Sequence, residues 1–438
     1  MKHFYLIVLF ISVSCKSFSQ DGFQFKKHQK KITIPFKLAS NLVIIPIEIN
    51  GIKMNFLLDS GVEDTVLFSL AENTEVELFN TEKITLRGLG TAAAAEGLKS
   101  TGNSLTCSGL TLKNQTIIVI LDETFNFSSS LGIPVNGIVG YHFFNKNLVE
   151  INYQSKKVVV HNTEIFKTKI LKSYESIDIS TSFNKPYLQA SLLFDTAEIE
   201  SKFLIDSGNS DAIWVFQKNL DSKLLPKKNF DDFLGRGFSG DINGKRAVIS
   251  SFRIKNFKFV SPLVAFPDTA SVRNVSLTND RAGSIGGGIL KRFNVFFDYE
   301  NKKLYLKKNA DFDIPFSFNK SGLTIQNVGF QYVKETIHEN LRSNIVKIEF
   351  GEREVDLKFK FELKPVYEIT NIRNGTPADE IGLLKGDIIL SINNVLSYRY
   401  TLEQINTILK SDEGRVINLE IERNKIILKK KFKLKSIL

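Results

Sequence analysis

The chain has 438 residues, a length that indicates two or three compact domains rather than one. A hydrophobic content of 42% is enough to bury sizeable cores and excludes a disordered chain. The net charge is +11, and much of the excess lies in the last twenty residues, where Lys alternates with Phe432 and Leu434. This pattern favours a solvated strand over a nucleic-acid-binding tail.

The first nineteen residues have the layout of a secretory signal. Lys2 and His3 precede an apolar stretch at 4–13, and small and polar residues follow. We expect a signal peptide over 1–19 and an exported protein that is periplasmic, on the cell surface or secreted. Lipid attachment at Cys15 is the alternative to simple cleavage. No later stretch is apolar enough to span a membrane, and cleavage would leave Cys107 as the only cysteine.

The next region reads as strands and turns. Asn50-Gly51 lies between two apolar runs, which is a strong hairpin signal. In the later part a polar turn at 195–201 divides two apolar runs. Further strands are predicted over 83–89, 103–112, 115–121 and 252–260, and hairpins are predicted to turn at Ser155-Lys156 and Asn301-Lys302.

An internal repeat divides this β-rich region into two halves, 30–165 and 170–310. Asp59-Ser60-Gly61 and Asp206-Ser207-Gly208 each end an apolar run and lie 147 residues apart (206 − 59). Two downstream landmarks repeat with an offset of 146 (283 − 137): GIVG at 137–140 with GSIG at 283–286, and 148–160 with 294–306. The halves are therefore predicted to be duplicated copies of one unit.

A third unit follows the two halves. Asn374-Gly375 predicts a turn, Pro377 suits the first turn of a short helix, and Gly386-Asp387 leads into a strand over 388–392. Thr401 and Gln404 form a capping box that begins a helix ending near Lys410. The string NGTPADEIGLLKGDIILSIN resembles the core of a PDZ domain. This resemblance implies peptide binding in a groove along the helix 401–410. A charged insertion over 330–363 lies where a carboxylate-binding loop would be expected.

The doubled tripeptide indicates paired acid chemistry. Two carboxylates about 3 Å apart cannot both ionise cheaply, so they share one proton. The ionised group can then take a proton from water while the protonated group donates to a carbonyl. Asp59 and Asp206 are the expected pair. Ser60 and Ser207 can hydrogen-bond across to the opposite turn, and Gly61 and Gly208 permit close approach of the backbone.

These residues resemble the catalytic turns of pepsin-like and retropepsin-like aspartic proteases. The resemblance implies a mainly β fold with two retropepsin-like β-barrel lobes, 20–167 and 168–312, followed by an α+β PDZ-like domain over 313–438. In that family each Asp turn is supported by a strand of two apolar residues and a Gly. Ile138-Val139-Gly140 fits this pattern, whereas Ser284 replaces an aliphatic residue in the second copy.

The resemblance also implies a flap over the substrate. The matching stretch, 86–97, lacks the Tyr of pepsin-like enzymes and is Gly-rich, so Gly88 and Gly90 are expected to serve as flap hinges. A similar loop at 234–244 suggests a second flap. The function predicted is an exported aspartic-type endopeptidase that needs no cofactor or metal and acts on polypeptides. The alternative is a non-catalytic peptide-binding adaptor that keeps the protease fold. The sequence leaves open whether a pro-segment, 21–35, is removed.

Overall fold

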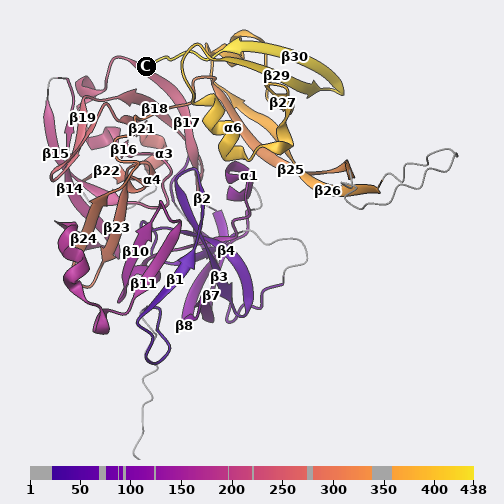
Figure 1. The fold of residues 1–438 in the computed structure, drawn as a ribbon. Helices are drawn as coiled ribbons and strands as arrows, with labels where there is room; N and C mark the ends of the chain where they lie inside the picture. The colour runs from indigo at the N-terminus through magenta and orange to yellow at the C-terminus, as the bar shows by residue number, and fades with distance from the viewer. Residues whose placement is uncertain are drawn as a thin grey trace, which may run out of the picture.

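The computed structural model describes residues 22–68, 75–86, 88–91, 95–122, 125–195, 197–219, 221–273, 280–337 and 358–438. The predicted signal peptide and Cys15 lie outside these residues. The fold is mainly β, as the sequence predicts, and its elements form four sheets (Figure 1). Among the residues described, no helix is both long and apolar enough to cross a membrane.

The first half forms an eight-stranded sheet in the order β2-β3-β4-β9-β5-β8-β7-β6. At its centre β4 pairs in parallel with β9, and β9 pairs antiparallel with β5. The predicted Asn50-Gly51 turn joins β3 to β4, and both turn residues have positive φ. The strands are β2 (Lys37–Ala39), β3 (Leu42–Ile49), β4 (Ile52–Leu58), β5 (Thr65–Leu67), β6 (Glu82–Leu86), β7 (Ala95–Cys107), β8 (Leu110–Ile120) and β9 (Gly137–Val139).

The second half repeats the same central pattern in a ten-stranded sheet. Here β15 pairs in parallel with β22, and β22 pairs antiparallel with β16. The repeat read from the sequence is therefore also a repeat of strand pairing. The strands are β13 (Ser180–Ser182), β14 (Lys185–Leu193), β15 (Glu198–Ile205), β16 (Ile213–Val215), β17 (Asn229–Gly237), β18 (Gly240–Val248), β19 (Ser251–Ile254), β20 (Phe257–Val260), β21 (Leu263–Pro267) and β22 (Arg281–Ile285).

A six-stranded sheet joins the two halves, because β10 of the first half pairs with β23 of the second. Its order is β1 (Lys31–Pro35), β11 (Lys157–His161), β10 (Leu148–Asn152), β23 (Phe293–Asp298), β24 (Lys303–Lys308) and β12 (Glu175–Asp178). Every residue of β1 pairs with β11, and Phe23 packs edge-on against Phe143 at 5.5 Å. Residues 22–35 are thus part of the folded body in this structure.

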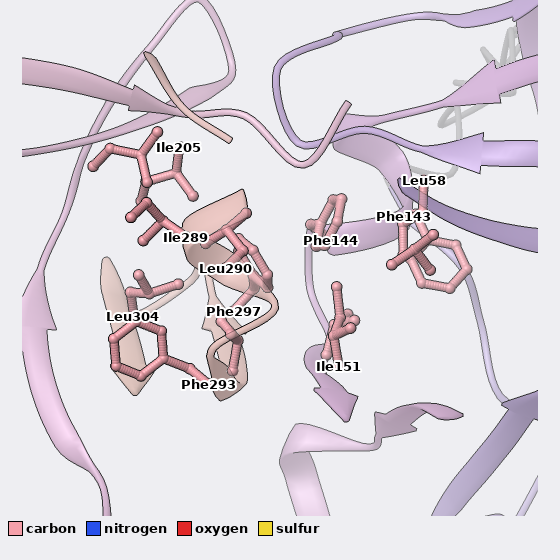
Figure 2. Close-up of a cluster of buried hydrophobic side chains, with 14 of the residues drawn as sticks. Leu58, Phe143, Phe144, Ile151, Ile205, Ile289, Leu290, Phe293, Phe297 and Leu304 are labelled. Atoms are coloured by element: carbon pink, nitrogen blue, oxygen red, sulfur yellow. The ribbon is translucent and has the colours of Figure 1, made fainter. Parts of the chain in front are cut away.

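One apolar core lies between this joining sheet and the two halves (Figure 2). A short helix follows the supporting strand in each half, α2 (Tyr141–Phe144) and α4 (Gly287–Leu290). Phe144 from α2 and Phe297 from β23 have ring centroids 4.8 Å apart, so the core runs across the boundary. Because apolar side chains of both halves are buried in this core, the hydrophobic effect fixes the position of one half relative to the other.

The third unit is built on the sheet β25 (Leu323–Ile337), β26 (Lys358–Ile372), β27 (Ile388–Ile392), β29 (Val416–Arg423) and β30 (Ile426–Lys433), with β28 (Val395–Leu396) paired to β27. The predicted capping box is present, and α6 (Leu402–Leu409) buries Leu402, Ile405 and Leu409. The other helices are α1 (Phe127–Leu131), α3 (Thr269–Val272) and α5 (Pro377–Glu380), and the 3-10 turns are η1 (Thr163–Ile165), η2 (Thr168–Ser173), η3 (Gln217–Asn219), η4 (Ser222–Leu224) and η5 (Ser397–Arg399).

Two predicted strands are wrong in detail. The predicted strand 103–112 crosses the turn between β7 and β8, where Ser108 and Gly109 both have positive φ. The predicted strand 252–260 is a hairpin that turns at Lys255, again with positive φ. At the two ends of the charged insertion 330–363, β25 and β26 stay paired as far as Ile337 and Lys358.

Candidate active site

Asp59 and Asp206 each follow the last residue of a central strand and are held by its parallel neighbour. The backbone N–H of Asp59 donates to the carbonyl of Val139 at 2.9 Å, and that of Asp206 donates to Ile285 at the same distance. The glycine after each supporting strand packs closely on the turn. A Cβ on Gly140 would lie 2.0 Å from the carbonyl oxygen of Val62, so no larger residue fits there.

Ser60 and Ser207 join the two turns by four hydrogen bonds. The N–H of Ser60 donates to Oγ of Ser207 at 2.9 Å, and the N–H of Ser207 donates to Oγ of Ser60 at 3.1 Å. Each hydroxyl then donates to a carbonyl across the boundary, Ser60 to Ile205 at 2.7 Å and Ser207 to Leu58 at 2.9 Å. Both side chains are buried, so these bonds fix the distance between the turns.

The two carboxyl groups meet next to the turn glycines. A Cβ on Gly61 would lie 3.1 Å from Oδ1 of Asp59 and 3.1 Å from Oδ1 of Asp206. A Cβ on Gly208 would lie 2.1 Å from Oδ2 of Asp59. Only glycine therefore leaves room for both carboxyl groups, and its N–H can also donate, as that of Gly61 does to Asp59 at 2.7 Å.

Burial and mutual repulsion keep a proton on this pair. Burial, together with the nearby charge of Asp206, raises the pKa of Asp59 to about 7. Burial also raises the pKa of Asp206, but the guanidinium of Arg281 and the ammonium of Lys185 oppose that rise. Asp59 consequently keeps its proton until the pH rises to about 7, and with Asp206 ionised the pair holds one proton and one negative charge, the protonation state that acid–base hydrolysis requires.

Sequence reasoning missed several polar groups around the pair. Arg281 is buried, and its Nη2 donates to Oγ of Ser284 at 2.7 Å, while the hydroxyl of Ser284 lowers the pKa of Asp206. Tyr299 places its hydroxyl 3.5 Å from the carbonyl of Ser60. The sequence did carry a signal for Ser284, because this residue breaks the apolar pattern of the supporting strand. Lys185 and Tyr299 have no comparable signal in the sequence.

The pair opens into a cavity of about 1240 Å³ that two loops cover. The N–H of Gly88 donates to Oγ of Ser239 at 3.0 Å, and the N–H of Ser239 donates to the carbonyl of Leu89 at 2.8 Å. Ser239 lies at the turn of the β17–β18 hairpin, the predicted second flap. The two predicted flaps thus meet over the cavity. Gly90 has φ of +125°, as expected of a position that only glycine adopts readily.

The third unit forms one wall of the same cavity. Lys385 and the first-half helix α1 line it together with four residues of β25 and β26. These four are Thr324, Gln326, Thr370 and Asn371. A Cβ on Gly132, at the end of α1, would lie 2.8 Å from Cβ of Leu402 in α6. The first turn of α6, the helix along which the sequence predicts a groove, therefore packs against the first half.

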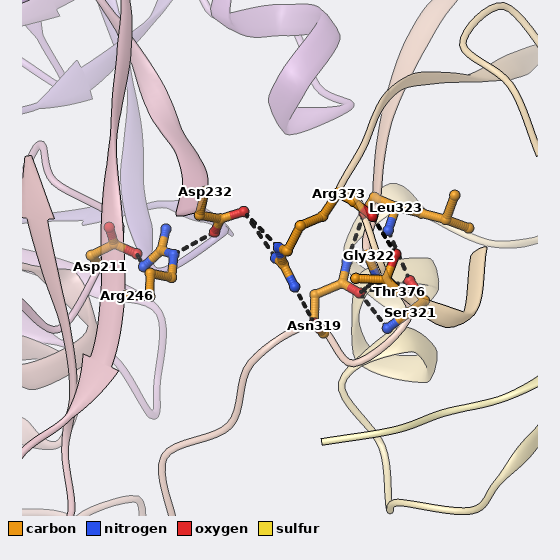
Figure 3. A network of polar contacts seen from close by, with 9 residues as sticks. All are labelled: Asp211, Asp232, Arg246, Asn319, Ser321, Gly322, Leu323, Arg373 and Thr376. Atoms are coloured by element: carbon orange, nitrogen blue, oxygen red, sulfur yellow. Dashed lines mark hydrogen bonds and ion pairs between the residues drawn. The ribbon is translucent and has the colours of Figure 1, made fainter. Parts of the chain in front are cut away.

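An ion-pair network anchors the third unit to the second half (Figure 3). Arg373 donates to Oδ1 of Asp232 from Nη2 at 2.9 Å and from Nε at 3.2 Å. Asp232 also accepts from Arg246, which reaches Asp211 at 2.8 Å. These side chains are largely buried, so the contact is more than a weak surface ion pair.

Comparison with protein families agrees with two parts of this description. The family model described as aspartyl protease matches residues 45–143, which contain Asp59, Ser60 and Gly140. The family model described as PDZ domain matches residues 368–423, which contain α5 and α6. No curated protein matches the chain. The chain therefore carries an aspartyl protease domain and a C-terminal PDZ domain in a mainly β fold.

Proposed function

We propose that this protein is an aspartic-type endopeptidase in which Asp59 and Asp206 together activate the water that attacks a peptide bond. The observation that carries the proposal is the meeting of two carboxyl groups at the floor of a covered cavity, on turns tied by four hydrogen bonds. Two buried carboxyl groups with one proton between them supply both an acid and a base near neutral pH.

In this reaction the ionised carboxylate removes a proton from water as the oxygen attacks the carbonyl carbon. The protonated carboxyl group donates its proton to the carbonyl oxygen, so the pair keeps one proton throughout. Such positioned acid–base groups contribute a rate factor on the order of 10²–10⁴. The loops at Gly88–Gly90 and Phe238-Ser239 cover an extended polypeptide and exclude bulk water.

The second half supplies the second catalytic turn in this proposal, as in a pepsin-like arrangement of two lobes. The aspartyl protease match covers the first half only, so the argument rests on the internal repeat. In both halves Asp-Ser-Gly follows a central strand, and that strand pairs with a parallel strand that a Gly follows. A duplicated unit that keeps both Asp and both Ser residues is best explained by a pair that works together.

The PDZ domain is proposed to bind polypeptide, either the substrate itself or a partner protein. Its sheet lines the cavity, so a bound chain could continue from the PDZ domain to the catalytic pair. We further propose that the protein acts outside the cytoplasm, on the evidence of the signal-like residues 1–19.

The test compares purified wild-type protein with Asp59→Asn and Asp206→Asn in a mixed peptide library. New peptide termini, identified by mass spectrometry, should appear with the wild type and fall by at least about 10²-fold in each variant. The thermal midpoint of each variant should stay close to that of the wild type, because Asn is isosteric with Asp. Cleavage that survives both changes would exclude the proposal. Saturable binding by the wild type without cleavage would instead support the adaptor function.

A further inference from the structure

The repeat between the halves is broken next to one carboxyl group of the pair. The N–H of Phe68 donates to the carbonyl of Asn136, and the N–H of Phe216 donates to that of Ala282 in the same way. Val135 of the first half is therefore the position equivalent to Arg281 of the second half. By the same register Ile138 corresponds to Ser284, since each follows the Gly that begins the repeated motif.

The two environments therefore differ in kind. Val135 and Ile138, on the side of Asp59, are buried apolar residues. Arg281 and Ser284, on the side of Asp206, are buried polar residues joined by the 2.7 Å hydrogen bond from Nη2 to Oγ. Nε of Arg281 also donates to the carbonyl of Gly283 at 3.1 Å, and its guanidinium lies 4.9 Å from the ring centre of Phe216. These contacts fix the guanidinium in position.

We propose that Arg281 and Ser284 are positioning residues that make Asp206 the ionised base of the pair and leave Asp59 as the protonated acid. The proposal rests on the aspartic endopeptidase function above. Ser284 pairs with Leu204, the N–H of Asp206 donates to the carbonyl of Ile285, and Asp206 and Arg281 line the same cavity, so both polar groups lie on the side of Asp206. There the hydroxyl of Ser284 and the guanidinium of Arg281 favour the ionised form of Asp206 and lower its pKa. A buried cation has a large effect on a carboxylate that lies nearby, because little water screens it.

The other charged and titratable groups around the pair do not favour one carboxyl group in this way. Lys185 follows the Phe183-Asn184 turn and acts on both Asp59 and Asp206. Tyr299 faces Asp59, and burial raises its pKa well above the ordinary value, so it stays neutral. Tyr187 lies near Arg281 rather than between the carboxyl groups. The difference between the surroundings of Asp59 and Asp206 thus comes from Arg281 and Ser284 in β22.

The assignment fixes the direction of both proton transfers. Asp206 takes a proton from the attacking water, and Asp59 gives its proton to the carbonyl oxygen, which produces a tetrahedral diol. When the C–N bond breaks, the nitrogen takes the proton that Asp206 holds, and a hydroxyl of the diol returns a proton to Asp59. One water and one peptide bond are consumed, one carboxyl terminus and one amino terminus are formed, and the pair returns to its starting protonation state. No other reactant is needed.

The experiment measures kcat/KM against pH for wild type, Arg281→Met and Arg281→Lys. Loss of the cation should move the acid limb of the profile to higher pH by about one unit or more, because Asp206 then binds a proton more readily. The alkaline limb should move little, and Arg281→Lys should keep the acid limb near its wild-type position. Arg292→Met is the matched control, since Arg292 is also buried but binds carbonyl groups of 288, 311, 312 and 314.

Two further measurements keep the inference falsifiable. If Arg281→Met does not fold, Ser284→Ala removes the hydroxyl group but keeps the guanidinium of Arg281, and it should shift the acid limb in the same direction by less. NMR titration of ¹³C-labelled Asp carboxyl groups in the wild-type protein without substrate should show Asp206 ionising before Asp59. An acid limb unmoved in Arg281→Met, or Asp59 ionising first, overturns the inference. Absence of cleavage by the wild type would overturn the proposed function instead, and the NMR order would still decide the asymmetry.

Discussion

At the scale of single residues, the carboxyl group of Asp59 is set apart by what surrounds it. The residue is 7% exposed, its carboxyl group lies beside a second carboxyl group, and the nearest residues of its supporting strand are apolar. Two N–H groups, from Gly61 and Gly208, donate to it and partly offset the loss of water. Burial and repulsion outweigh these bonds, so the group holds its proton far above the range of an exposed Asp.

This protonation predicts the alkaline limit of activity. The pKa of Asp59 rises from 3.8 to about 7, so the proton that the acid must donate is lost only as pH rises through about 7. We expect kcat/KM to fall through that region and the enzyme to remain active at mildly acidic pH. A pH profile with a peptide substrate measures this limit. An alkaline limb in the ordinary carboxyl range, near pH 4, would show that burial does not raise this pKa.

At the scale of elements, the two loops over the cavity depend on close backbone contact. The N–H of Gly90 donates to the carbonyl of Ser271 at 2.8 Å, and a Cβ on Gly90 would lie 2.3 Å from the carbonyl oxygen of Ser239. The loop therefore reaches the β17–β18 hairpin only because residue 90 has no side chain.

Gly90→Ala should consequently separate the two loops. We expect kcat/KM for peptides to fall by about 10-fold to 100-fold, since a displaced loop no longer positions the substrate. The measurement is kcat and KM for one peptide substrate. Gly51→Ala is the control, because Gly51 also has positive φ but meets no atom within 4 Å. An equal loss of activity in both variants would mean that backbone strain, not loop contact, is responsible.

The elements that the sequence predicted well are those with local signals. The capping box at Thr401 and the Asn50-Gly51 turn need only a few neighbouring residues, and both are present. The turns at Ser108-Gly109 and Lys255 were missed because no Asn-Gly or Asp-Gly pair marks them. Doubled landmarks predicted the repeat, but sequence alone could not place Arg281 and Lys185, because their positions depend on pairing between distant strands.

At the scale of the whole molecule, the PDZ domain is fixed where it forms part of the cavity. The joining sheet sets the two Asp-Ser-Gly turns face to face, and the PDZ sheet closes one side of the space above them. The network from Asp211 through Arg246 and Asp232 to Arg373 holds this arrangement, and Ser40 adds an N–H bond to Glu403 at 2.9 Å. Substrate access is therefore expected to depend on how the PDZ domain is held.

Arg373→Ala should loosen the PDZ domain while leaving the Asp59–Asp206 pair intact. Removal of two charge-assisted hydrogen bonds to Asp232 should weaken docking by about 1.5–3 kcal/mol, although Arg246 still neutralises part of the charge on Asp232. We expect KM to rise more than kcat falls, together with faster hydrogen exchange in β25 and α1. Arg399→Ala, which changes an exposed arginine of the same domain, should alter neither. Unchanged exchange in Arg373→Ala would mean that α1 and α6 hold the domain without the ion pair, because Gly132 and Leu402 pack so closely there.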